Sequence, residues 1–162
     1  MLKYRTLFFF VIFTSLLSAE TFVITNTNDS GAGTLREAMT LANDSAGPDT
    51  LLFNISKSDL NYSSLGIWTI NLHRQLPDIL DDGLFIDGSS QATFIGEDMN
   101  PNGPEIEIQG ANSINIGLNI LGDNFTISHL NLNRFVNTHI SVWNAQNGII
   151  AGCYIGTNAT GS

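Results

Sequence analysis

The residues best suited to chemistry are carboxylates that stand close together. Four of them gather in one short span, and they are Asp78, Asp81, Asp82 and Asp87. Glu105 and Glu107 are two positions apart, so on a strand they would share one face. Paired carboxylates can hydrolyse glycosidic bonds, and clustered carboxylates can bind calcium. The plainer interpretation is that the aspartates belong to Asp-Gly turns and the glutamates line a solvated strand face. We therefore predict no catalytic, cofactor-binding or metal-binding residue, with calcium as the open alternative.

Other polar and aromatic residues give weaker indications. His129, Arg134 and His139 are scattered, and no acids stand beside Arg134 as they would around a catalytic base. The 98–103 segment offers oxygen atoms but lacks the spacing of a calcium-binding loop. Three aromatic residues could stack on sugar rings, with partial burial as the alternative for each: Trp68, Trp143 and Tyr154. The sequence contains no serine elbow, zinc motif or phosphate-binding loop.

The elements that would position these residues are short and repeated. After Pro48 the chain is a series of short β-type segments separated by Asn and Gly, and helical periodicity does not return. An offset of 23 positions matches Ile127 with Ile150, and an offset of 22 matches Leu118 with Ile140. The same offsets also match Asn124 with Asn147, Leu132 with Ile155, and Ile120 with Val142. A period in this range, built from very short strands, predicts an all-β parallel β-helix, a solenoid in which each coil is one repeat. The rival is a β-sandwich, whose strand pattern recurs about every 8–12 residues.

One amphipathic helix is predicted ahead of these strands. Thr34 and Glu37 fit a capping box, and apolar residues follow at helical spacing on one face. The residues that would form this cap are Thr34, Leu35, Glu37, Ala38, Met39 and Ala42. The two ends of a solenoid expose core and unpaired backbone groups, so end coils need atypical capping structure. We predict that this helix lays its apolar stripe over the open N-terminal end.

The first residues and the charge indicate export. Lys3 and Arg5 precede an apolar run, residues 7–17, that is too short to span a bilayer, and small residues follow, as in a signal peptide. The formal net charge of the whole chain is −9, and removing residues 1–19 takes away two bases and no acid. This acidic composition argues against a nucleic-acid partner, because binding to phosphates requires clustered Lys and Arg. After residue 17, no segment is long and apolar enough to span a membrane. The single cysteine, Cys153, excludes an internal disulfide.

Several segments resemble a known bacterial family. The stretch TNTNDSGAGTLREA, residues 25–38, resembles the S-L-R-E-A-type motif at the N-terminal end of secreted and cell-surface right-handed β-helix proteins, with Thr34 where Ser is usual. The residues 76–79 and 84–91 (LPDI and LFIDGSSQ) and the residues 152–161 (GCYIGTNATG) resemble coils of the same proteins. The likeness covers most of residues 21–162 and extends to the pectate-lyase-like β-helix superfamily. It implies a right-handed solenoid, and it is unspecific for activity.

Together these observations predict three segments: a signal peptide, residues 1–19; an N-terminal strand and capping helix, residues 20–56; and the first coils of a parallel β-helix, residues 57–162, expected to be the front of a longer chain. The resemblance implies a surface scaffold or adhesin-type module without catalytic activity, secreted or held at the cell surface. Its expected partners are further coils, another copy joined through the open C-terminal coil, or surface glycans. The alternatives are the front piece of a polysaccharide lyase or hydrolase, and a small carbohydrate-binding module.

Overall fold

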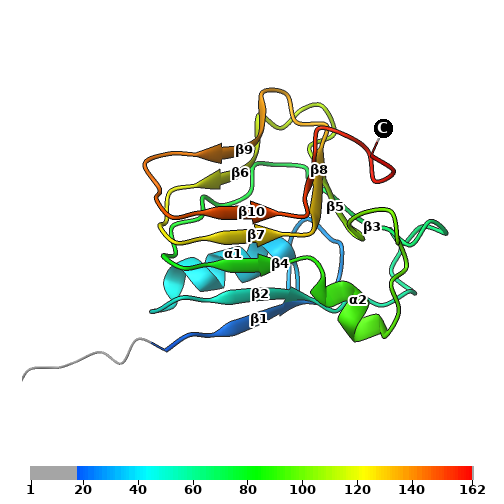
Figure 1. The fold of residues 1–162 in the computed structure, drawn as a ribbon, viewed down its shortest axis with the longest axis horizontal. Coiled ribbons are helices and arrows are strands. Elements are labelled where there is room, and N and C mark those ends of the chain that lie inside the picture. Colours follow the sequence, from blue (N-terminus) through cyan, green and yellow to red (C-terminus); the bar gives the residue numbers. More distant parts are fainter. Residues whose placement is uncertain (1–17, 162) are drawn as a thin grey trace, which may run out of the picture.

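The computed structural model describes residues 18–161 (Figure 1). The predicted signal peptide falls mostly on residues 1–17, which lie outside the described residues, so it stays a prediction. Within residues 18–161, neither helix has the length and apolar character needed to cross a membrane.

The described chain is mostly β-structure with two short helices, and all pairings between its named strands are parallel (Figure 1). Sheet A stacks β1 (Thr21–Ile24), β2 (Thr50–Phe53), β4 (Phe85–Asp87), β7 (Thr126–Ser128) and β10 (Ile149–Ala151) in chain order. Sheet B stacks β3 (Trp68–Asn71), β5 (Ile106–Gln109), β8 (Leu130–Asn133) and β11 (Tyr154–Ile155). Sheet C pairs β6 (Ile116–Ile120) with β9 (Thr138–Val142). We call residues 135–161, which contain β9, β10 and β11, the last layer.

The core consists of columns in which like residues from successive strands stack. In sheet A the paired residues of one column are Phe22, Leu51, Ile86, Ile127 and Ile150. In sheet B a column runs through Ile70, Ile108, Leu132 and Ile155. The inner members are buried, whereas Ile150 and Ile155 are exposed because no strand within residues 18–161 pairs beyond them. Stacking of this kind buries one apolar face of every strand against its neighbours.

The repeat offsets read from the sequence are confirmed as strand registers. Ile150 pairs with Ile127 and Leu118 pairs with Ile140, as the offsets of 23 and 22 predict. Asn124 and Asn147 both adopt positive φ, at 58° and 57°, and the Asn147 amide donates to Asn124 Oδ1 at 3.2 Å. Asn tolerates this left-handed conformation better than most residues, which explains why it recurs at the corner.

The earlier layers are longer than the period predicts. Thr50 pairs with Phe85 and Phe85 with Thr126, so these steps span 35 and 41 residues. The longest step contains α2 (Ser90–Ile95), which ends at Gly96 with φ of 80°. The prediction of a single helix was therefore wrong. A helix of six residues carries too little periodicity to be recognised, and this one is held by side-chain bonds to β2 and the residue Ile55.

The first helix, α1 (Leu35–Asp44), forms where the sequence predicts it. Thr34 is its N-cap and accepts a hydrogen bond from the Glu37 N–H at 3.3 Å. Glu37 accepts in return from the Gly33 N–H at 2.7 Å, one residue before the expected Thr34 N–H. The predicted apolar stripe is buried, and its members are Leu35, Ala38, Met39 and Ala42. The stripe belongs to the same core cluster as the sheets, and the helix contacts β1 and β2.

Candidate functional site

The N-terminal end of the stack is joined to α1 through the side chain of Asn43. Its amide donates to the Asp78 carbonyl at 2.7 Å, and its oxygen accepts from the Leu80 N–H at 2.9 Å. Ile79, between these residues, pairs in parallel with Ile120 of sheet C. The Asn43 side chain therefore bonds to residues 78 and 80 as a neighbouring strand would bond to an edge.

Arg36 of α1 makes similar contacts with the backbone of residues 74 and 75, just before the residues that Asn43 binds. Its guanidinium donates to the carbonyls of Arg74 at 2.9 Å and Gln75 at 2.6 Å. The same group forms an ion pair with Asp29 at 2.5 Å, and both side chains are largely buried. Arg36 and Asn43 thus satisfy backbone groups along residues 74–80 that would otherwise lack partners. This role was not predicted from the sequence, because these partners lie 35–39 positions away.

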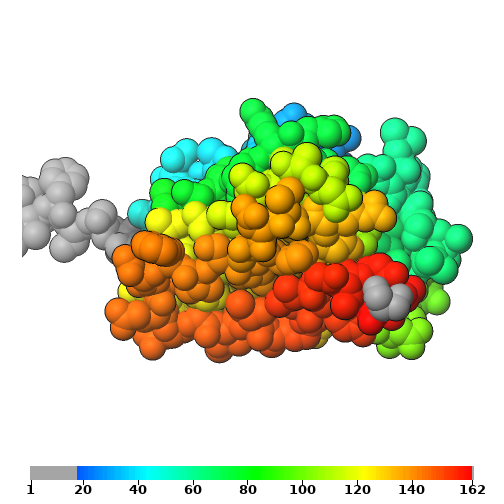
Figure 2. All heavy atoms as spheres, turned by 90° about the horizontal axis from the view of Figure 1, so that it is seen from above, coloured from blue at the N-terminus to red at the C-terminus, as the bar shows by residue number. Residues whose placement is uncertain are grey.

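The opposite end, formed by the last layer, combines exposed apolar and neutral polar side chains. Among the described residues no strand pairs with the outer edges of β9, β10 or β11. No Asp, Glu, Lys or Arg occurs after Arg134, although the whole chain has 15 acids and 6 bases. Large apolar side chains are exposed on this layer, and they are Val136, Val142, Trp143, Ile149, Ile150 and Ile155. Figure 2 shows the residues of the last layer, in orange and red, gathered along one side of the molecule.

The four clustered aspartates hold backbone and side-chain donors, as the turn interpretation predicts. Asp82 accepts from the Asp123 N–H at 2.8 Å, and Asp87 accepts from the Ser89 N–H at 3.0 Å. Asp78 accepts from the Asn119 amide at 2.9 Å. Asp81 accepts from the Asp49 N–H at 3.0 Å. Burial raises the pKa of Asp81, and the charges of Asp49 and Asp82 act in the same direction against this backbone hydrogen bond.

Glu105 and Glu107 do not lie on a solvated face, so that interpretation was wrong. Both side chains are buried, because loops and the C-terminal segment cover this part of sheet B. Glu107 accepts hydrogen bonds from three side chains, those of Thr69, Gln109 and Asn133, at 2.7–2.8 Å. Glu105 precedes β5 and accepts from the Met99 N–H instead. The two carboxylates therefore line two different places on the surface, a pocket and a groove.

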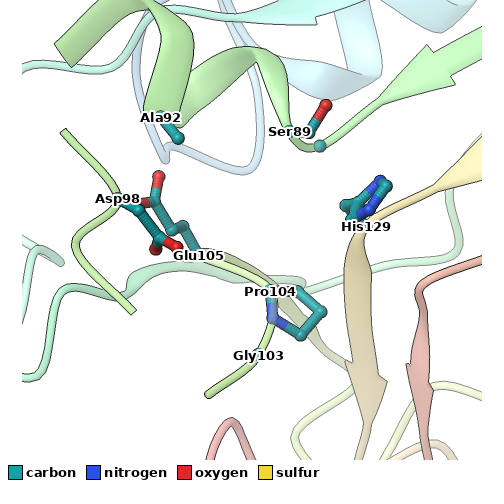
Figure 3. Close-up of a pocket in the computed structure, with 8 residues that line it drawn as sticks. Ser89, Ala92, Asp98, Gly103, Pro104, Glu105 and His129 are labelled. Carbon is teal, nitrogen blue, oxygen red and sulfur yellow. The ribbon is translucent and has the colours of Figure 1, made fainter. Parts of the chain in front are cut away.

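The first of these places is a pocket of about 110 Å³ between α2 and the loop before β5 (Figure 3). Its wall is formed by Gly88, Ser89, Ala92, Asp98, Gly103, Pro104, Glu105 and His129. Figure 3 shows Asp98 and Glu105 together at one side of the pocket and His129 on the opposite side. Burial, opposed by a backbone hydrogen bond from Met99, raises the pKa of Glu105, and the nearby charge of Asp98 raises it further.

The second place is a groove of about 270 Å³ over sheet B. Polar side chains line its floor, including Thr69, Glu107 and Gln109, and Arg134 stands at its wall. Within residues 18–161, no carboxylate lies within ion-pair distance of the Arg134 guanidinium. The groove therefore combines amide and hydroxyl groups with one carboxylate, Glu107, and one cation, Arg134, that forms no ion pair among the described residues.

The three aromatic candidates are not brought together. Trp68 is fully buried, stacks on Tyr62 at 4.5 Å and donates through Nε1 to the Ser56 carbonyl at 3.0 Å. Its prediction as a sugar contact was wrong, because its alternating position in β3 points into the core. Trp143 is 66% exposed and follows β9 in sheet C, whereas Tyr154 is half-buried in sheet B and donates to the Asn102 carbonyl.

The part of the chain that the structure describes holds no group of three or more His, Cys, Asp or Glu side chains arranged to bind a metal. A search with protein-family models found no match to this chain, and a search of curated proteins found none either.

Proposed function

We propose that this chain is the N-terminal module of an exported, right-handed parallel β-helix, a surface scaffold or adhesin-type protein without catalytic activity of its own. The observation that carries the proposal is the contrast between the two ends of the stack. At the N-terminal end, Arg36 and Asn43 of α1 occupy backbone groups beside sheet C, although no described strand pairs with the outer edge of β1. The last layer presents unpaired strand edges and exposed apolar side chains.

The stacking of the sheets supports the β-helix. Sheets A and B both add strands in chain order, and every named pairing is parallel. Connections between parallel strands of one sheet are right-handed in nearly all proteins, which supports the handedness. The 22- and 23-residue registers of the last two layers have the length of one coil.

The contrast between the ends defines the role of the module. At the N-terminal end, α1 packs on β1 and β2 and bonds to the backbone of residues 75 and 78. The last layer then offers Ile150 and Ile155 as the next positions of the two core columns. Its partner is a further coil of the same architecture, from a longer chain or from another copy.

The acidic residues support a structural role over a catalytic one. Asp78, Asp82 and Asp87 are acceptors for backbone or side-chain donors, and Glu107 is held by three side chains. A carboxylate used in this way stabilises the layer-to-layer contact.

Sedimentation of the purified protein tests the open end. We expect concentration-dependent self-association, and we expect Trp143→Lys with Ile149→Lys to abolish it, because two charges on this uncharged layer repel a second copy. Leu60→Lys is the matched control, since Leu60 is 98% exposed and lies outside the last layer. A wild-type protein that stays monomeric at high concentration would count against an end that accepts a partner.

The groove over sheet B favours a second candidate function, carbohydrate binding. Its amide and hydroxyl groups, with Glu107 and Arg134, are typical of sites that hold polar ligands through a few placed groups. Glycan-array binding of the wild type and of Arg134→Ala tests this candidate. Binding that is lost in the variant supports it, and a blank array removes it.

A further inference from the structure

One oxygen of Glu105 is buried without a hydrogen-bond partner. The residue is 5% exposed, and its Oε1 accepts from the Met99 N–H. Its Oε2 forms no hydrogen bond among the described residues, although the Asn100 N–H lies close enough to the carboxyl to lower the pKa of Glu105. Leaving a buried carboxylate oxygen unpaired is expensive, so its environment calls for a donor or a cation.

A second carboxylate stands beside this oxygen. Asp98 accepts from the Asn100 N–H through Oδ1 at 3.0 Å, and its side chain lies next to that of Glu105 at the same side of the pocket (Figure 3). The nearest cation that acts on Glu105 is Lys57, and its ammonium already lies 3.6 Å from Glu97. Two carboxyl groups therefore share one side of the pocket, and among the described residues no Lys or Arg forms an ion pair with either of them.

The pocket has space for a small hydrated ion. Its volume of about 110 Å³ corresponds to a few water molecules at about 30 Å³ each. Ser89 and His129 line the pocket across from the two carboxylates (Figure 3). Polar side chains and water can therefore both contact an ion held between them. The loop that carries the carboxylates is held by Asn100, whose amide donates to the carbonyls of Pro104 at 3.0 Å and Ala159 at 3.3 Å.

We propose that this pocket binds a calcium ion through the Asp98 carboxylate and the free oxygen of Glu105, with water in the remaining positions. Calcium accepts six to eight oxygen ligands in irregular geometry, and mixed sets of carboxylates and water suit it. Zinc prefers tetrahedral sets of His and Cys, and only one imidazole reaches this pocket. Magnesium needs stricter octahedral geometry.

The proposed ion also links the loop to the C-terminal segment. Asn100 joins residues 98–105 to Ala159, which is buried. Holding the loop with calcium would therefore hold residues 157–161 over sheet B as well. This coupling gives a readout of binding that is independent of any catalytic activity.

Calorimetric titration of calcium into the chelator-treated, purified protein tests the proposal. We expect one site, an increased unfolding temperature in millimolar calcium, and slower hydrogen exchange in residues 157–161. Glu105→Gln removes the free charged oxygen while keeping an acceptor for Met99, and should weaken binding by roughly tenfold or more. Asp98→Asn should weaken it similarly.

Glu97→Gln is the matched control, because Glu97 lies in the same loop, is exposed and contacts Lys57. It should leave binding unchanged. The proposal is overturned if the folded wild type gives no heat and no thermal shift, or if Glu105→Gln binds calcium as the wild type does. An equal thermal shift with magnesium would overturn the assignment to calcium.

Discussion

The side chain of Gln91 forms two hydrogen bonds with the backbone of Ile55, as a neighbouring strand would. Its Oε1 accepts from the Ile55 N–H at 2.9 Å, and its Nε2 donates to the Ile55 carbonyl at 2.8 Å. Both residues are fully buried. One side chain of α2 thus satisfies two backbone groups just beyond the end of β2.

Replacing this amide should destabilise the fold strongly. Gln91→Leu keeps much of the volume but leaves the Ile55 N–H and carbonyl buried without partners. Each such group costs about 1–3 kcal/mol, so we expect a loss of about 2–5 kcal/mol in the free energy of unfolding. Urea denaturation measures it. Gln146→Leu, at an exposed glutamine, should change stability by less than about 0.5 kcal/mol, and equal losses in both variants would contradict this account.

The buried stripe of α1 gives a second prediction. Leu35→Asp with Met39→Asp places two charges in the core beneath the first layer, which a protein with a stability of about 5–15 kcal/mol cannot tolerate. We expect aggregation or loss of the cooperative unfolding transition, measured by light scattering and circular dichroism. Leu41→Asp, on the same helix but 44% exposed, should remain folded. A soluble double variant with unchanged melting would rule out the capping role.

Asn43 tests the hydrogen bonds between α1 and residues 78–80. In Asn43→Asp, the carboxylate can still accept from the Leu80 N–H. It cannot donate to the Asp78 carbonyl, and its negative charge repels the oxygen of that carbonyl. We expect a loss of about 1–3 kcal/mol in the free energy of unfolding. The Leu41→Asp variant adds the same charge to α1 without touching residues 74–80, so thermal melts of the two proteins separate charge from contact.

Asp81 predicts a specific dependence of stability on pH. Burial raises its pKa in the folded protein, so in the window between its unfolded and folded pKa values the native state binds more protons than the unfolded state. Its contribution to stability therefore falls as the pH rises through that window, starting near the ordinary value of 3.8. Asp81→Asn should raise the melting temperature at neutral pH and lose that advantage in acid.

Glu97→Gln is the control for this experiment. Its side chain is 68% exposed, and its charge is not among those that shift the pKa of Asp81. Melting curves of both variants across the acidic range would show whether the effect belongs to the buried carboxyl. A gain in Asp81→Asn that is the same at every pH would mean that its charge is not responsible.

Part of this fold was predictable because the responsible interactions are local or repeated. The bounds of α1 follow from Thr34, Glu37 and an apolar stripe, all within about three turns of one helix. The registers of Ile150 on Ile127 and of Ile140 on Leu118 follow from a repeat, since like residues stack when each layer has the same length. Neither inference required knowledge of distant contacts.

Only the tertiary structure decided the rest, because it depends on groups far apart in the chain. Trp68 reads as an aromatic residue in a short strand, and only the position of sheet B shows that it is buried. Asn43 and Gln91 look like ordinary polar residues, yet each bonds to backbone more than 30 positions away. Glu105 belongs to a pocket that exists only when α2, the loop before β5 and His129 meet. Local patterns determine helices, turns and repeat length, whereas burial and pairing at sites are fixed by which layers come to lie together.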